Sequence, residues 1–339
     1  MPKTIGNLRP WTSNLYCCLE LGTLPKPQKC LAIDIVKIQV SFCMNSKHRS
    51  FYRRQSSIVD CVWLNSNLHD ANVRIFDCST FLNYTDDHPT KPYDVVSGSS
   101  EYKKAHIPNA AFLDLQNSFS KKGSAYSFTL PELTELAVSF QHEGVGNNCH
   151  VILYSRNGIQ WATRFWWMLY VVGYKKVSIL NGGFQEWLNL GLRTETEITV
   201  FPPADFNLDL KENIFVDKEY VLQAINANNH ILINALTKDI HDGLSKRYGR
   251  PGHIPRSLNI PFHKFVQEHT EKFISFHKAQ ELIESMGITK DNIIVNYCGG
   301  GIAATLDAFI LYQLGFKNLK IYDNSMSEWA LDETLPINV

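Results

Sequence analysis

The chain has 339 residues, of which 44% are hydrophobic and 19% are charged, and its formal net charge is zero. This composition is ordinary for a globular protein, and the length suggests two domains. The balanced charge gives no reason to expect a nucleic-acid or membrane surface.

Residues 1–56 differ from the rest of the chain, because they hold nine Lys or Arg residues and only two acidic ones. Glu20 and Asp34 argue against a transit peptide, and no signal-peptide core is evident. The stretch 30–44 could form a short strand. We interpret 1–56 as a poorly ordered N-terminal extension. A targeting segment, or translation from a start site upstream of the true one, is the alternative. We expect a cytoplasmic protein, or a mitochondrial one if the extension is a transit peptide.

The pattern of apolar runs in residues 57–192 predicts one compact α/β domain. Apolar runs at 73–77 and 151–154 predict strands, and the second run is typical of a parallel strand covered on both faces. The mostly apolar segment 161–172 predicts a helix packed on the sheet. Its apolar stretch 165–174 is far shorter than the roughly 20 residues of a transmembrane helix. A strand at 176–180 and Trp187 close the domain, and the proline-containing stretch 193–213 predicts a linker.

Residues 214–339 repeat this order, with predicted strands at 230–234, 293–297 and 319–322 and a helix at 303–314. His253-Ile-Pro repeats the earlier His106-Ile-Pro. The distance from the strand's Tyr to the closing Trp is 33 residues in the first copy (Tyr154 to Trp187) and 32 in the second (Tyr297 to Trp329). Matching spacings of this kind predict two copies of one α/β domain, each a mainly parallel sheet flanked by helices.

The chain has eight cysteines, at positions 17, 18, 30, 43, 61, 78, 149 and 298. They form no Cys-x-x-Cys pair and no Cys/His spacing of a zinc site, so no metal is expected. Seven of them we interpret as mostly buried thiols in a reducing compartment. Cys298 is the exception, because it lies between a predicted strand and a predicted helix.

Cys298 is followed by Gly299, Gly300, Gly301, Ile302 and Ala303. Three glycines allow the backbone to curl so that several N–H groups point inward as a nest for an anion. The following helix directs the positive end of its dipole at the same point. We therefore expect a thiolate-rich Cys298 that can attack a sulfane sulfur and then be held as a persulfide.

The two His-Ile-Pro motifs, the loop Tyr-Cys-Gly-Gly-Gly-Ile-Ala-Ala and the closing Ser-Glu-Trp resemble the tandem-domain rhodanese family over about residues 57–339. The resemblance implies a thiosulfate or 3-mercaptopyruvate sulfurtransferase with a catalytic second domain and no cofactor. It also implies an inactive first domain, and Ser155 stands there at the position of Cys298. The partners would be a small anionic sulfur donor and a cyanide or thiol acceptor, with no nucleic acid or membrane, and the protein would be a monomer.

An anionic donor needs cations near Cys298, ideally arginines. The resemblance favours Arg247 for this role, with Arg250 second, and surface charge is the alternative for both. His253 is expected to make structural hydrogen bonds, and Arg156 of the first copy to be a solvated loop charge.

Several family features are missing. Phe128 stands where mercaptopyruvate enzymes place a His, Leu236 stands where an Arg often contacts the substrate, and Gly300 replaces a Ser. Asp114 is a possible counterpart of a family Asp. The donor therefore stays open, and a persulfide carrier or a non-catalytic partner-binding module is the alternative function. A phosphatase is disfavoured, because no Arg lies in 299–306 to hold a phosphoryl group.

Overall fold

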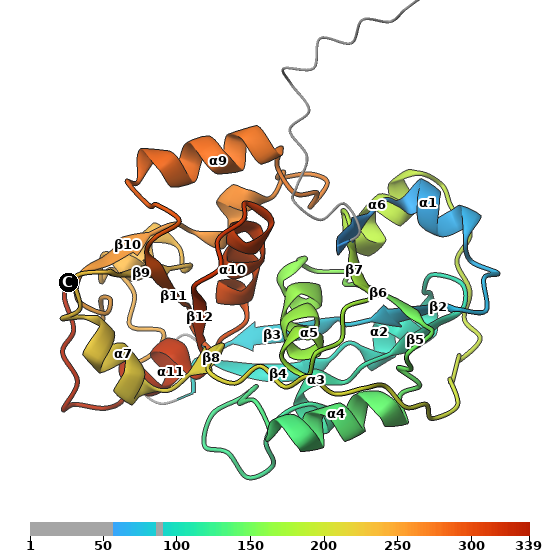
Figure 1. The fold of residues 1–339 in the computed structure, drawn as a ribbon, viewed down its shortest axis with the longest axis horizontal. Coiled ribbons are helices and arrows are strands. Elements are labelled where there is room, and N and C mark those ends of the chain that lie inside the picture. The colour runs from blue at the N-terminus through green and yellow to red at the C-terminus, as the bar shows by residue number, and fades with distance from the viewer. Residues whose placement is uncertain (1–56, 86–90) are drawn as a thin grey trace, which may run out of the picture. The chain divides into compact units, whose positions relative to one another are not determined.

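The computed structural model describes residues 57–85 and 91–339 (Figure 1). The predicted N-terminal extension, with its possible strand and four of the eight cysteines, lies outside the described residues. The other four cysteines, Cys61, Cys78, Cys149 and Cys298, are free thiols with buried side chains. For the first three this confirms the prediction of buried thiols, and burial raises the pKa of Cys61 to about 12.

The first copy contains a five-stranded sheet in the order β1-β7-β6-β2-β5, and every neighbouring pair is parallel. Its strands are β1 (Ile58–Val59), β2 (Val73–Asp77), β5 (Ala110–Phe112), β6 (His150–Tyr154) and β7 (Val177–Leu180). The helices around it are α1 (Cys61–Ser66), α2 (Ser99–Lys104), α3 (Leu115–Ser118), α4 (Leu133–His142), α5 (Gln160–Val171) and α6 (Gly183–Asn189).

The second copy has the same topology, because its all-parallel sheet runs in the equivalent order β8-β12-β11-β9-β10. Its strands are β8 (Phe215–Val216), β9 (His230–Asn234), β10 (Ser257–Asn259), β11 (Ile293–Tyr297) and β12 (Leu319–Tyr322). Its helices are α7 (Lys218–Ala224), α8 (Lys238–His241), the 3-10 helix η2 (Phe262–Phe265), α9 (Phe276–Ser285), α10 (Ala303–Gln313) and α11 (Ser325–Trp329). The repeated α/β fold predicted from the sequence is thus confirmed.

The first copy also contains a feature that the sequence did not predict, an antiparallel hairpin of β3 (Thr80–Tyr84) and β4 (Tyr93–Ser97). Figure 1 shows it reaching from the first copy towards α11 of the second. Its two strands pair from Thr80 with Ser97 to Tyr84 with Tyr93. The hairpin thereby places Tyr84 and Tyr93 of the first copy near the loop that follows Cys298 in the second.

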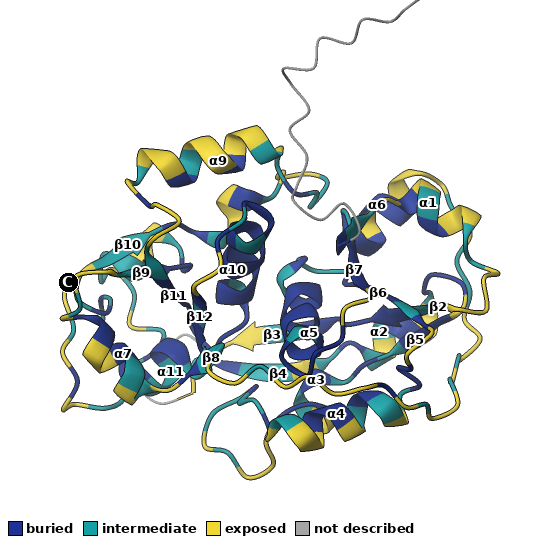
Figure 2. Cartoon of the chain, viewed as in Figure 1, coloured by how far each residue is buried: buried dark blue, intermediate teal, exposed yellow. Residues whose placement is uncertain are grey.

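The two copies meet through α5 and α10, which lie side by side and are almost wholly buried (Figure 2). Thr163 and Thr305 share a hydrogen bond of 2.7 Å between their hydroxyls, and the Trp167 indole donates to the Thr305 carbonyl at 3.0 Å. The larger hydrophobic core cluster includes residues of both copies. Because these helices pack against each other, each one is apolar on more than the face it turns to its own sheet.

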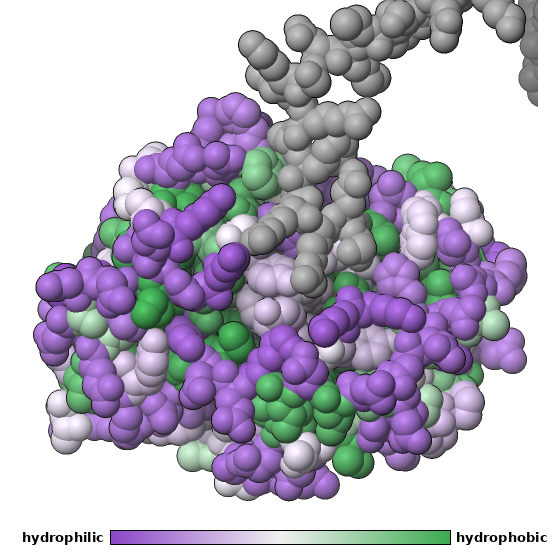
Figure 3. Space-filling model, viewed as in Figure 1, coloured by the Kyte–Doolittle hydropathy of each residue, from purple (hydrophilic) through white to green (hydrophobic). Residues whose placement is uncertain are grey.

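Hydrophilic side chains cover most of the face seen in Figure 3, and hydrophobic ones occur there in small groups. Among the helices of 57–85 and 91–339, none is long and apolar enough to cross a bilayer.

Candidate active site

Cys298 occupies the position predicted for it, directly after β11 and five residues before α10. The carboxyl ends of parallel strands are where α/β proteins bind ligands. Its side chain is buried, with 2% of its surface exposed, but it lines a cavity of about 80 Å³. Its own backbone N–H donates to Ser325 Oγ at 3.0 Å, and that hydroxyl donates to the Tyr322 carbonyl at 2.7 Å. The start of the loop is therefore fixed to the end of β12.

The loop after Cys298 has the free N–H groups that the prediction requires. Within 57–85 and 91–339, none of the backbone N–H groups of Gly299, Gly300, Gly301, Ile302 and Ala303 donates a hydrogen bond to another residue. Gly299, Gly300, Ile302 and Ala303 line the cavity together with Cys298. Unsatisfied N–H groups at the start of a helix of 11 residues suit an anion.

Close packing explains why the loop is glycine-rich. Gly301 has φ +71°, and a Cβ there would lie 2.1 Å from the Asp323 carbonyl oxygen. A Cβ on Gly299 would lie 2.1 Å from the Tyr248 hydroxyl, and one on Gly300 would lie 2.6 Å from the Tyr93 hydroxyl. The glycines thus let two tyrosines approach the backbone around the sulfur.

The cavity wall is mainly aromatic and comes from both copies. The first copy supplies Tyr84 and Tyr93 from the hairpin, Phe128, and Trp161 from α5, and the second copy supplies Tyr248 and Phe262. Leu82, Leu236 and Gln160 complete the side-chain lining. Burial raises the pKa of Tyr93 and Tyr248, so both phenols stay protonated at neutral pH. No Lys or Arg is among the described residues that line this cavity.

The two predicted substrate arginines have different environments. The guanidinium of Arg247 stacks on Tyr84, with its central carbon 4.2 Å from the ring centroid, so Arg247 contacts a residue of the cavity wall. Arg250 is not among the described residues that line the cavity, and its guanidinium donates to the carbonyls of Trp329, Ala330, Asp332 and Leu335 at 2.6–3.1 Å. Five N–H donors on one planar group make Arg250 a clamp for the C-terminal segment.

Phe128 and Leu236 both lie in the cavity wall. At these positions the resemblance to the rhodanese family predicts a His and an Arg. Phe128 has φ +67°, which is uncommon for a residue with a large side chain. Asp114 instead caps α3, accepting from the Asn117 N–H at 3.0 Å and from Ser97 Oγ at 2.7 Å. His253 makes the structural contacts predicted for it, since its Nδ1 lies 2.8 Å from the His241 carbonyl oxygen.

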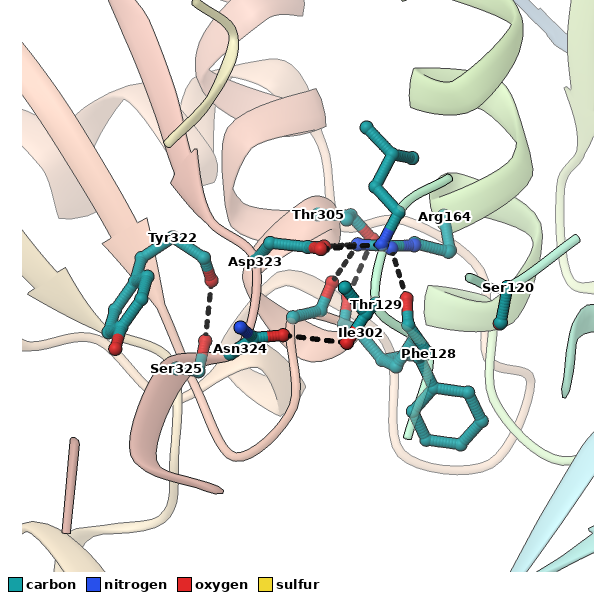
Figure 4. Close-up of polar contacts among 12 residues, drawn as sticks. Ser120, Phe128, Thr129, Arg164, Ile302, Thr305, Tyr322, Asp323, Asn324 and Ser325 are labelled. Carbon is teal, nitrogen blue, oxygen red and sulfur yellow. Dashed lines mark hydrogen bonds and ion pairs between the residues drawn. The ribbon is translucent and has the colours of Figure 1, made fainter. Parts of the chain in front are cut away.

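A buried cation outside the cavity holds the catalytic loop. Arg164, on α5 of the first copy, is fully buried and forms an ion pair of 2.8 Å with Asp323. It also donates to the carbonyls of Phe128 at 2.6 Å and Gly301 at 3.1 Å (Figure 4). One guanidinium thus connects a helix and a cavity-wall residue of the first copy to the glycine loop of the second.

Two further bonds reinforce this contact between the copies. Asp323 accepts from the Leu130 N–H at 2.6 Å, and the Thr129 hydroxyl donates to Asn324 at 2.9 Å (Figure 4). Thr129 and Leu130 of the first copy are therefore bound to Asn324 and Asp323 at the end of β12. No sequence pattern indicates this set, because nothing near Arg164 in the chain points to Asp323, a partner 159 residues further on.

The equivalent loop of the first copy is built differently. The Ser155 hydroxyl donates to the Gly158 carbonyl within the same loop at 2.7 Å. The sequence suggested that Arg156 is a solvated loop charge, but the structure shows it largely buried. It bonds Asp77 at 3.0 Å and lies 3.9 Å over the Phe184 ring. Its side chain is only 12% exposed, so it stabilises the core of the first copy.

No group of three or more His, Cys, Asp or Glu side chains that could hold a metal ion occurs in the part of the chain that the structure describes. The described residues that line the cavity include one thiol, that of Cys298, and the phenols of Tyr84, Tyr93 and Tyr248.

Comparison with known proteins identifies this arrangement. The rhodanese-like domain family matches the chain twice, over residues 60–190 and 217–332. The chain belongs to the rhodanese family. Both rhodanese-like domains correspond to the two copies described above.

Several relatives are similar to this rhodanese-family chain over most of their length. Thiosulfate/3-mercaptopyruvate sulfurtransferase 2 of Arabidopsis thaliana is 29% identical over 83% of this chain and 86% of its own. The 3-mercaptopyruvate sulfurtransferase of Mus musculus is 32% identical over 68% of this chain and 79% of its own. The crystal structure of SseA from Escherichia coli matches with a TM-score of 0.65 and 27% identity, over 79% of this chain and 98% of that one. The chain is thus a two-domain sulfurtransferase.

Proposed function

We propose that Cys298 carries a sulfane sulfur from a small donor to an acceptor as a persulfide. In the first step the Cys298 thiolate attacks the outer sulfur of thiosulfate and sulfite leaves, or it takes the sulfur of 3-mercaptopyruvate and pyruvate leaves. In the second step cyanide or a thiol removes the outer sulfur and restores the thiolate. Such a reaction follows double-displacement kinetics.

The observation that supports this most is the set of loop N–H groups without an acceptor among the described residues, next to the only thiol that lines the cavity. Main-chain donors at a helix start stabilise a developing anion without reorganising. In the proposed cycle they would hold the thiolate and then the persulfide anion. The names of the relatives, which include thiosulfate and 3-mercaptopyruvate, suggest the donors.

Arg247 is the residue we assign to the anionic end of the donor. Its contact with Tyr84 places it next to the cavity wall, although it does not itself line the cavity. In the proposed cycle Arg247 would bind the anionic end from this position beside the wall. We assign the first copy a supporting role, since Ser155 cannot form a persulfide and the hairpin tyrosines only complete the wall.

We further propose that the protein acts as a cytoplasmic monomer, with the mitochondrial matrix as the alternative. One of the Arabidopsis thaliana relatives is named as mitochondrial. Fractionation of the cells that express it and light scattering of the purified chain test both statements.

The decisive experiment is replacement of the sulfur acceptor atom. Cys298→Ser should abolish thiocyanate formation from thiosulfate and cyanide. The wild type treated with donor alone should gain about 32 Da, one sulfur atom, on the peptide that contains Cys298. Cys149→Ser, which changes another buried thiol, is the matched control and should keep the activity. A Cys298→Ser variant that releases sulfite at the wild-type rate would refute the proposal, and persulfidation by a protein donor alone would favour the carrier.

A further inference from the structure

The charges along the approach to Cys298 constrain the donor. Six aromatic side chains, Tyr84, Tyr93, Phe128, Trp161, Tyr248 and Phe262, form most of the cavity wall. Aromatic carbon offers no hydrogen bond that could replace the hydration of an anion. An anionic body placed here would lose its hydration and, among the described lining residues, would find no Lys or Arg to replace it.

A larger hollow shares part of its wall with the cavity, and it too has no Lys or Arg among its described lining residues. This hollow has a volume of about 710 Å³ and shares Gln160 and Phe262 with the Cys298 cavity. In the described part of the chain its ionisable lining residues are His263, Glu268 and Glu271, so two carboxyl groups and no Lys or Arg lie in its wall. The hollow is far larger than a thiosulfate ion needs, and the cavity of about 80 Å³ beside the sulfur has room for only a few atoms.

We propose that the preferred donor of this sulfurtransferase is an organic persulfide, R–S–SH, whose body R carries no negative charge. The body lies in the hollow, and the terminal sulfur reaches Cys298 past Gln160 and Phe262. This inference rests on the proposed function, because it takes Cys298 as the sulfur carrier. Anionic donors remain substrates, but only Arg247, outside the cavity, assists them.

The transfer needs no further reactant. The Cys298 thiolate attacks the terminal sulfur of R–S–SH, a new sulfur–sulfur bond forms, and the bond between the two donor sulfurs breaks. The products are the Cys298 persulfide and the thiolate R–S⁻, which takes a proton from water. Atoms, charge and oxidation level balance, since one persulfide is exchanged for another.

Three persulfides of similar size separate charge from chemistry, namely those of 2-mercaptoethanol, cysteamine and 3-mercaptopropionate. Their bodies are neutral, cationic and anionic. With the full chain and cyanide as acceptor, we expect kcat/KM for the first two to exceed that for the third by at least about tenfold, as expected for unlike and like charges at short range in a partly dry site. The Cys298→Ser variant measures the direct reaction of each donor with cyanide, which is subtracted.

Four variants test the cause of the ranking. Leu236→Arg adds a cation to the cavity wall and should raise kcat/KM for 3-mercaptopropionate persulfide and thiosulfate. Leu222→Arg, on α7 outside this cavity, adds the same charge and should not. Glu271→Gln should lower the kcat/KM for cysteamine persulfide relative to that for 2-mercaptoethanol persulfide. Arg247→Met should raise KM for thiosulfate.

Equal rates for the three persulfides, or a preference for the anionic one, would overturn the inference. The proposed function is judged separately, by the sulfur adduct on Cys298. An adduct from any donor upholds it even if the charge ranking fails, and the absence of an adduct from every donor overturns both.

Discussion

Arg164 offers a sharp test of how the first copy supports catalysis. Replacing it by Met removes the guanidinium but keeps a long side chain in a fully buried position. The change leaves the Asp323 carboxylate without its cation and the carbonyls of Phe128 and Gly301 without this donor. Both structural stability and the geometry of the catalytic loop depend on the same group.

The size of the effect follows from the burial of the pair. Arg164 is 0% exposed and the Asp323 side chain is 13% exposed. Breaking a buried pair by removing one partner costs about 3–5 kcal/mol, because the other charge stays in a poorly hydrated place. Asp323 keeps the Leu130 N–H, which favours the lower end of that range. At about 2–4 °C per kcal/mol, the melting temperature should fall by at least about 6 °C.

The assay compares two arginines of the first copy. Arg164→Met and Arg156→Met each remove a largely buried guanidinium paired with an Asp, but only Arg164 contacts the catalytic loop. Melting by calorimetry should show both variants destabilised. Below their melting temperatures, only Arg164→Met should lower kcat for sulfur transfer, since only it frees Gly301.

A double-mutant cycle with Asp323→Asn measures the coupling between the two charges. The single variants should each be destabilised, and the double variant should be less unstable than their sum. Wild-type melting and wild-type kcat in Arg164→Met would refute the reasoning. Equal loss of kcat in Arg156→Met would show that general loosening of the first copy, and not the loop contact, is responsible.

Two further predictions concern Gly301, just before α10, and Asp307 within it. Gly301→Ala should lower the free energy of unfolding, measured by urea titration, by at least about 2 kcal/mol. The control is Gly287→Ala, which has the same φ of +71° but open space around its Cβ, and it should lower the free energy of unfolding by less. Equal losses in the two variants would contradict the clash with Asp323. Asp307 is fully buried without a hydrogen-bond partner among the described residues, and burial raises its pKa well above 3.8. Above about pH 4 the unfolded chain releases this proton while the folded chain keeps it, so stability is lost as the pH rises. Asp307→Asn should remove that slope and be more stable at pH 7, and a less stable variant at pH 7 would show that the carboxylate is stabilised.

Local patterns in the sequence were enough to predict the repeated fold and the place of Cys298. Strands β2, β6, β9 and β11 are mainly apolar runs, and α5 and α10 are mostly apolar, so pattern and structure agree to within a residue or two. The strands β1 and β8 were missed, because two residues are too short to carry a pattern. The glycine loop was predictable because a strand end, its turn and the next helix are contiguous in the chain.

The partners of the charged side chains were decided by the tertiary structure. Arg247 and Arg250 lie three residues apart and have the same chemistry, yet one stacks on a tyrosine of the other copy and the other binds carbonyls of residues 329–335. The aromatic wall likewise collects side chains from segments far apart in the sequence. Periodicity reports which face of an element is buried, but the group that it meets there depends on how distant elements pack.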